Sequence, residues 1–320
     1  MAHKFISKIE AGETINDLYL VKDPILRSTT RGDLYIAMYL CDKSGQINGR
    51  MWQATEIVYK SIPKPGFVHI QGRSELYQNN LQIIVNQITP IDSSKINIDD
   101  FLPKTKKNID QMLEEVKTII SQIKNPQLNA IVNSFLNDKE RMEKFISAPG
   151  GMKLHHSYIG GLLEHVHNML RVANAILPLY PNVQADLVIT GIFLHDIGKT
   201  EELSYDLSFA YTNQGQLLGH IVQSVLMINE KANALRASGT EISQETLDAL
   251  EHVIVSHHGQ YEYGSPKLPA MTEAFMVCFI DDLDAKINMV ESAIEEEDGD
   301  ENWTAWKNAL QTRLYRKKLE

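Results

Sequence analysis

Residues 187–199 read LVITGIFLHDIGK, and this stretch decides how the C-terminal two-thirds of the chain is interpreted. Its first eight residues are mostly apolar, which is typical of a helix buried in a protein core. The helix is expected to end near His195 and Asp196, because Gly198 follows in the position that a helix C-cap favours. At a helix end both side chains can turn towards one site, and Lys199 adds a cation beside them. The stretch therefore predicts a core helix that delivers a His-Asp pair to a polar site.

Outward from this helix, apolar residues recur at intervals of three and four from residue 108 onward. This repeat predicts an all-α domain at residues 108–320, with its core at about 155–290 and a linker before it at 92–107. Glycines and prolines separate the helices expected at 159–177, 183–197, 216–236, 243–258, 270–297 and 302–317.

The N-terminal residues 1–91 follow a different period. Residues 34–40 alternate between two faces, as in a half-buried strand, and turn signals at 42–45 and 78–80 mark two hairpins. Five strands with a short helix at 53–61 between the third and the fourth is the arrangement of an OB-fold β-barrel. The side chains expected to fill this barrel are Leu34, Ile36, Met38, Leu40, Val68, Ile70, Ile83 and Val85.

Charge and cysteine content narrow the function classes. The net charge is −10, and the first 100 residues hold 11 basic and 11 acidic side chains, so the acidity belongs to the rest of the chain. A protein that coats nucleic acid by charge alone is usually basic, so a nucleic-acid role here requires local patches, stacking or metals. The sequence has no apolar leader and no apolar stretch of about 18 residues, which predicts no membrane contact. Cys41 and Cys278 lie far apart and fit a reducing compartment, so we expect a cytoplasmic protein.

Histidines concentrate where the helices are expected: nine of the eleven fall between residues 155 and 258. Imidazoles and carboxylates that converge from several helices can hold divalent metal ions. The residues that successive helices offer for this are His165, His195, Asp196, His220, His257, His258, Asp281 and Asp282. Each one alone is also consistent with an ordinary structural residue, so the prediction depends on the set.

The order of these residues resembles the HD-domain metal-dependent phosphohydrolases, whose pattern H…HD…H…H…D describes the members that bind two metals. The resemblance implies that His165, His195, Asp196 and Asp281 hold one ion, and that Asp196, His220 and His257 hold a second. It selects Asp281 over Asp282 by matching residues 280–285 to the family's ending. It also implies that Asp196 and Lys199 are catalytic, and that His155, His156 and His258 contact substrate or support the ligands.

The combination of an OB-like domain with HHSYIGGLLEHV, LHDIGK, LLGH and SHHG resembles the YhaM-type 3′→5′ exoribonucleases over nearly the whole chain. This resemblance implies an exonuclease that releases nucleoside 5′-monophosphates from single-stranded RNA, with single-stranded DNA as a further candidate substrate. Manganese or cobalt are the implied ions, with magnesium or iron as alternatives.

The barrel offers a binding surface for such a single strand. Tyr35, Tyr39 and Arg50 lie on the outer face of the second and third strands, where OB-folds bind single strands, and Trp52 lies either there or in the core. The alternative is that these side chains pack against the helical domain or another subunit, and a homo-oligomer is an open expectation.

Two rival functions remain at this stage. One is an HD-domain phosphohydrolase of nucleotides or cyclic nucleotides, although Gly-Tyr-Pro does not follow His257-His258 as it does in one cyclic-dinucleotide class. The other is a single-strand-binding protein of replication or regulation with an inactive HD site. Every position of the metal pattern is filled, which favours the enzyme.

Overall fold

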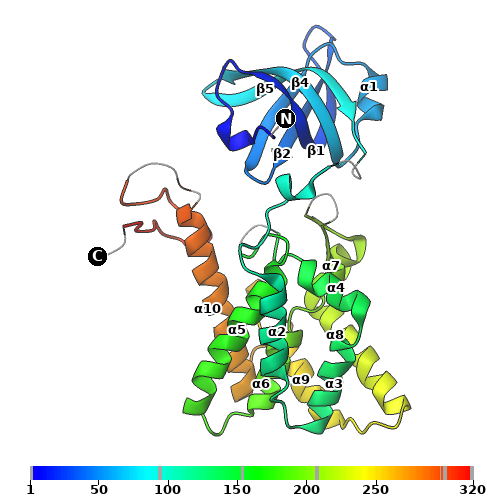
Figure 1. The fold of residues 1–320 in the computed structure, drawn as a ribbon, viewed down its shortest axis with the longest axis vertical. Coiled ribbons are helices and arrows are strands. Elements are labelled where there is room, and N and C mark those ends of the chain that lie inside the picture. Colours follow the sequence, from blue (N-terminus) through cyan, green and yellow to red (C-terminus); the bar gives the residue numbers. More distant parts are fainter. Residues whose placement is uncertain are drawn as a thin grey trace. The chain divides into compact units, whose positions relative to one another are not determined.

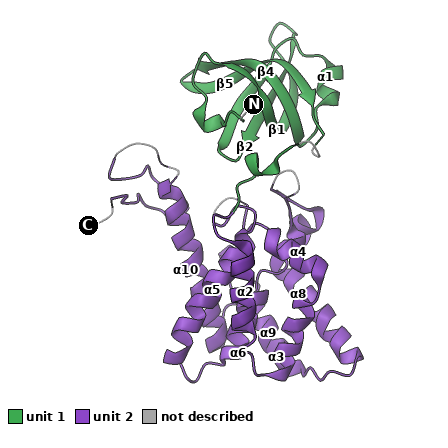
Figure 2. Ribbon diagram, viewed as in Figure 1, with its two compact units in different colours: residues 1–104, 206–208 green, residues 105–205, 209–320 purple. Residues whose placement is uncertain are grey.

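The computed structural model describes residues 3–92, 96–152, 155–205, 209–295, 297 and 301–317 (Figure 1). The chain forms two compact units, the first ending at Lys104 and the second beginning at Thr105 (Figure 2). Residues 93–95, which belong to the expected linker, lie outside the described part. Each unit is described by itself below.

The first unit is a closed five-stranded barrel with the strand order β1-β2-β3-β5-β4. Strands β3 and β5 pair in parallel, and the other neighbours pair antiparallel. The elements are β1 (Thr14–Ser28), β2 (Leu34–Asp42), β3 (Gly45–Met51), α1 (Glu56–Ser61), β4 (Gly66–Tyr77) and β5 (Asn80–Pro90), with short 3-10 turns at Ile6–Lys8 and Ile98–Asp100. A helix between the third and fourth strands of a closed barrel is the OB-fold, as the sequence predicted.

The barrel core contains seven of the eight predicted residues, and Leu34 at the start of β2 is half-buried. Leu34 pairs with Ser28, the last residue of β1, so it lies at the end of that ladder. At Gly72 the β4–β5 register shifts, and a Cβ there would lie 2.2 Å from the carbonyl oxygen of Ile84. The bulge and the missing side chain let the two strands bend closely enough to close the barrel.

The second unit is a helical bundle. Asparagine, aspartate, serine and threonine side chains cap the N-termini of five of its helices and accept hydrogen bonds from their first turns. Its elements are α2 (Ile109–Ile120), α3 (Pro126–Leu136), α4 (Lys139–Ser147), α5 (Gly161–Ile176), a 3-10 turn (Leu177–Leu179), α6 (Ala185–Leu194), α7 (Lys199–Glu202), β6 (Leu203–Ser204), β7 (Ala210–Tyr211), α8 (Asn213–Ala237), α9 (Gln244–Ser256), a 3-10 turn (Tyr261–Tyr263) and α10 (Thr272–Glu295).

Helix α6 is the centre of this bundle. Every residue from Leu187 to Leu194 is buried, and α3, α5, α9 and α10 all contact the helix. The ring of Phe193 packs edge-on against Phe145 of α4, with 5.5 Å between the centroids. A helix enclosed on all sides holds its C-terminal residues firmly, which matters because His195 and Asp196 follow directly.

The helix predicted at 302–317 is wrong. This segment forms a hairpin instead, in which Trp303 pairs with Tyr315 and Lys307 with Thr312. Thr304 is fully buried and pairs with Leu314 through both its backbone and its hydroxyl, which favours the hairpin over a helix. None of the helices in the described part of the chain has the length and hydrophobicity that a membrane crossing requires.

Candidate metal centre

Two histidines at helix ends are fixed in the same way. His195 follows α6 and its Nδ1 lies 2.8 Å from the carbonyl oxygen of Ile192, while His257 follows α9 and its Nδ1 lies 2.6 Å from that of Ile254. A carbonyl oxygen only accepts hydrogen bonds, so Nδ1 carries the proton in both rings. This arrangement leaves Nε2 as the atom that each ring turns towards the site, and in a neutral ring that nitrogen can bind a metal ion.

His165 on α5 is held between two aspartates of α10. Its Nδ1 lies 2.7 Å from Asp284 Oδ2, and its Nε2 lies 3.1 Å from Asp281 Oδ1. Burial acts to lower the pKa of His165, but the carboxylates of Asp281 and Asp284 raise it to about 9. The two carboxylates thus favour positive charge at this ring, and a metal cation on Nε2 would supply that charge.

His220 is positioned by a break in α8. Gly219 has a φ of 70°, which places the chain in the left-handed region just before His220. Both the backbone nitrogen and Nδ1 of His220 then contact Oε1 of the buried Glu202, at 3.0 and 3.2 Å. The Nε2 of His220 is left facing Asp196.

Asp196 lies between His195 on one side and His220 and His257 on the other, and each of its two carboxylate oxygens faces one side. Its Oδ1 is 3.4 Å from His220 Nε2 and 3.7 Å from His257 Nε2, and its Oδ2 is 3.3 Å from His195 Nε2. Burial by itself would raise the pKa of Asp196, but Lys199, at 2.6 Å, and His195 hold that pKa well below its usual range. Asp196 is therefore a permanent anion at the centre of the site.

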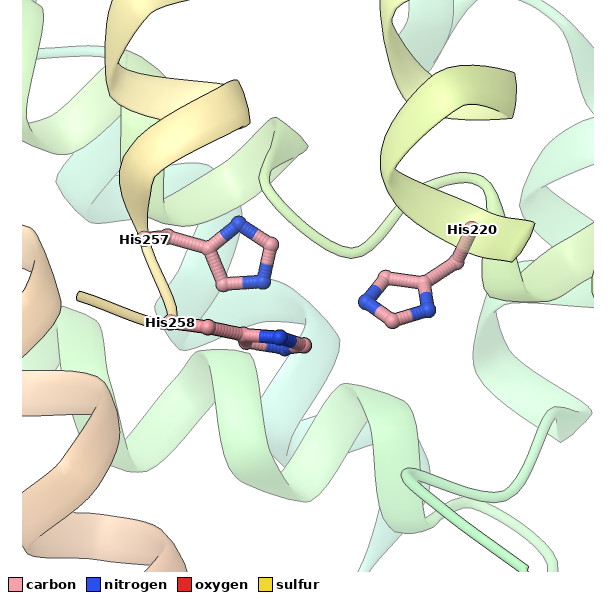
Figure 3. Close-up of side chains that lie close together, drawn as sticks. All are labelled: His220, His257 and His258. Carbon is pink, nitrogen blue, oxygen red and sulfur yellow. The ribbon is translucent and has the colours of Figure 1, made fainter. Parts of the chain in front are cut away.

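The structure brings the predicted ligands into overlapping groups whose ligand atoms lie within 4.8 Å of one another. One group is His165, His195 and Asp281; a second is His220, His257 and His258; and His195, Asp196 and His257 link the two. The rings of the second group converge from α8 and from the end of α9 (Figure 3).

These residues fit a divalent metal ion. Eleven buried side-chain atoms in the described part of the chain make no hydrogen bond, and five of them lie at this site: the Nε2 atoms of His165, His195, His220 and His257, and Oδ1 of Asp196. Buried polar atoms left without partners are costly, and unpaired atoms that face one another are those a metal would satisfy. Neutral imidazoles mixed with carboxylates suit manganese, iron, cobalt or zinc.

The residues predicted to contact substrate differ in their placement. His155 is half-buried, lines the pocket beside the ligands, and its ring lies 5.8 Å from that of His165. His258 belongs to the second ligand group, with its Nδ1 held 2.7 Å from the carbonyl oxygen of Tyr263. Both ring nitrogens of His156 are engaged, by Tyr158 and by Asp284, so the expectation that His156 contacts substrate directly gives way to a role in positioning Asp284.

Sequence reasoning missed three residues that support the ligands. Asp284 binds His165, His156 and Asn168, and Glu202 binds His220. Asn288, one helical turn beyond Asp284, accepts a hydrogen bond from the backbone nitrogen of His156. Asp284 lies three residues after Asp281 on α10, and this spacing was the available signal for it.

Close packing at Gly198 fixes the distance between Asp196, two residues before it, and His220 on α8. A Cβ at Gly198 would lie 2.2 Å from the carbonyl oxygen of His220 and 2.8 Å from the backbone nitrogen of Ser224. We therefore expect Gly198→Ala to displace the start of α8 and lower hydrolytic activity about 100-fold, as misplaced catalytic groups do. The control is Gly239→Ala, which strains a φ of +90° at the end of α8 away from the ligands. Equal activity of the two variants would contradict this prediction.

On the barrel, the predicted outer residues form a surface of rings and one cation. The ring of Tyr35 lies tilted against that of Trp52, with 5.0 Å between the centroids, and the Arg50 guanidinium lies 5.9 Å from the ring centroid of Trp52 and 5.4 Å from that of Tyr77. Trp52, Tyr77 and Tyr39 are exposed, which places Trp52 outside the core. Tyr77, at the end of β4, was not predicted.

A buried His/Asp centre on helices, preceded by an OB-fold barrel, defines a metal-dependent phosphohydrolase of the HD class, and the HD domain family matches residues 162–286. The chain is 36% identical over 287 residues, 89% of each protein, to the 3′-5′ exoribonuclease YhaM of Bacillus subtilis (strain 168). It therefore belongs to the YhaM family of HD-domain proteins.

Two solved structures each match part of the chain. The second OB-fold domain of replication protein A from Methanococcus maripaludis is 20% identical, with 29% of this chain and 97% of that chain covered and a TM-score of 0.24. A replication protein A heterotrimer bound to single-stranded DNA is 23% identical, with 29% and 69% covered and a TM-score of 0.22.

Proposed function

We propose that the protein is a metal-dependent 3′→5′ exoribonuclease that hydrolyses single-stranded RNA to nucleoside 5′-monophosphates. The main support is the set of buried, unpaired ligand atoms that face one another around Asp196. Membership of the YhaM family supplies the reaction and the substrate class. The rival with an inactive HD site is less well supported, because all six predicted ligands converge.

We assign one ion to His165, His195, Asp196 and Asp281, and a second to Asp196, His220, His257 and His258, with manganese or cobalt as the preferred metals. When bound, these ions would lower the pKa of water and supply hydroxide near neutral pH. Burial lowers the pKa of both His257 and His258, which keeps their rings neutral and available as ligands.

Lys199 and His155 are the residues that we assign to the substrate phosphate. The Lys199 ammonium contacts Asp196 and the carbonyl oxygen of Gly150, and it lines the same pocket as His155. Asp196 and burial together keep this ammonium fixed, and its pKa is raised despite the burial. Lys199 would neutralise the charge that develops on the phosphoryl oxygens.

The experiment for this function follows a 5′-labelled single-stranded RNA incubated with metal-stripped protein, with and without added manganese. We expect a ladder of products that shorten from the 3′ end, only when manganese is present. RNA that stays intact under both conditions would overturn the proposal.

Strand binding by the barrel is the second part of the proposal. The double variant Tyr35→Ala with Tyr39→Ala should weaken binding of single-stranded RNA about 10-fold, because stacking of a base on an aromatic ring contributes roughly 1–3 kcal/mol. Fluorescence anisotropy with a labelled oligonucleotide measures this. The control is Tyr180→Ala, which removes an exposed tyrosine from the helical unit. Unchanged affinity of the double variant would exclude this face as the strand site.

Three finer assignments are part of the proposal. Single-stranded DNA offers the same bases and phosphodiester and is a second candidate substrate. The exposed side chains Phe275, Phe279, Leu283 and Ile287 form an apolar stripe along α10 that is suited to a homo-oligomer contact. The cytoplasm is the proposed compartment, in keeping with the free thiols of Cys41 and Cys278.

A further inference from the structure

A pocket of about 430 Å³ opens directly from the metal centre. Its inner end is formed by the ligands Asp196, His257, His258 and Asp281 and by Lys199. The rest of the lining, its outer part, is formed by the uncharged residues Tyr263, Ala285, Met289, Ala309 and Leu310, and by Asp282 and Lys286, whose charges pair with each other at 2.7 Å. The volume is in the range of small-molecule sites, roughly 300–1,000 Å³. A ligand that fits both ends carries a phosphate at one end and a flat apolar group at the other.

The far wall of this pocket is the tip of the C-terminal hairpin, the segment that begins beyond the end of α10 in Figure 1. Ala309 and Leu310 lie in its turn, between the paired residues Lys307 and Thr312. The hairpin is anchored at its base, since the Glu297 carboxylate accepts hydrogen bonds from the Ala305 backbone nitrogen and from Lys307 Nζ. These hydrogen bonds hold the hairpin in place, so its tip is an ordered part of the pocket wall.

The opposite wall is tied to a metal ligand. Tyr263 holds His258 through its backbone carbonyl oxygen, at 2.7 Å, while its side chain is 62% exposed and borders the pocket. An exposed ring at the mouth of an apolar pocket can stack on a base. Because the carbonyl belongs to the backbone, the ring can be removed without removing the support of His258.

We propose that this outer part is a subsite for the 3′-terminal nucleoside of the strand, bound between Tyr263 and the hairpin tip with its 5′ phosphate at the metal centre. The inference rests on the proposed function. The apolar and aromatic side chains of the subsite offer contact to a base, and its two charged side chains, Asp282 and Lys286, pair with each other at 2.7 Å.

The test compares two ligands that share a phosphate and differ by the base. Isothermal titration calorimetry with the manganese-loaded full chain should show adenosine 5′-monophosphate binding about 10-fold more tightly than ribose 5-phosphate. Leu310→Asp should weaken binding of the nucleotide about 10-fold and leave ribose 5-phosphate unchanged. Tyr263→Ala should also weaken binding of the nucleotide, and this variant leaves the hairpin unchanged. Leu179→Asp, which changes a 73% exposed leucine outside the pocket, is the control.

Equal affinity of the wild-type protein for both ligands, or nucleotide affinity that neither variant alters, would overturn the subsite. The RNA ladder is followed in parallel, so the two proposals can fail separately. Shortened RNA with unaltered nucleotide binding in both variants refutes the subsite alone. If Leu310→Asp abolishes the preference for adenosine 5′-monophosphate over ribose 5-phosphate while the RNA stays intact, the result supports the subsite and refutes the exoribonuclease.

Discussion

Asp196→Asn should lower the turnover of single-stranded RNA at least about 1,000-fold, which is the scale of losses at residues that act as one catalytic unit. Asp196 faces both ligand groups, with Oδ1 towards His220 and His257 and Oδ2 towards His195. The amide keeps the shape of the side chain and removes its charge. We expect the metal content, measured by mass spectrometry of the purified protein, to fall with the activity.

The design must separate lost chemistry from lost folding. Lys199 is buried 2.6 Å from Asp196, so neutralising the aspartate leaves a buried cation without its counter-ion, which destabilises a protein strongly. The double variant Asp196→Asn with Lys199→Met removes both charges and should recover thermal stability without recovering activity. Asp248→Asn, at an exposed position of α9, is the control. Activity of Asp196→Asn within 10-fold of wild type would refute the central role of Asp196.

Local patterns were sufficient to predict the fold. Alternation in residues 34–40 marked a barrel strand, because a strand with one buried face repeats every two residues. The apolar run of residues 187–194 marked a core helix, because a helix enclosed on all sides has no polar face. Four of the six metal ligands predicted from the resemblance lie at a helix end or a helix break: His195 and Asp196 follow α6, His220 follows the break in α8, and His257 follows α9. Side chains at such positions can turn towards one site.

What the sequence did not reveal depends on contacts between distant segments. Glu202 supports His220 across 18 residues, and no local period signals such a pair. Asp284 supports His165 across 119 residues, and its spacing from Asp281 places it on one helix face without showing which partner it meets. The hairpin at 302–317 was mistaken for a helix because its apolar spacing is compatible with both structures, and the buried Thr304 decides between them only once Leu314 is in place. The tip of that hairpin, at Ala309 and Leu310, lines a pocket together with Tyr263, which lies more than 45 residues earlier in the chain.

His258→Ala should remove the second metal ion and reduce RNA hydrolysis about 100-fold, the scale found for weakened metal sites. The ring nitrogens of His258, His220 and His257 come within 4.8 Å of one another, and the centroids of the His257 and His258 rings are 4.2 Å apart. The first group, around His165, His195 and Asp281, does not include His258. We therefore expect the metal content to fall from two ions per chain towards one, rather than to zero.

The matched control is His252→Ala, which removes a half-buried histidine from α9, the helix that ends just before His257 and His258. His252 accepts a hydrogen bond from the backbone nitrogen of Ala270 and belongs to neither ligand group. Its replacement should leave both the metal content and the activity near wild type. If His258→Ala instead retains two ions and loses only affinity for nucleotides, His258 is a substrate contact rather than a ligand. The metal content of this one variant thus decides between the two roles, because a lost ligand and a lost phosphate contact both slow hydrolysis but only the first releases an ion.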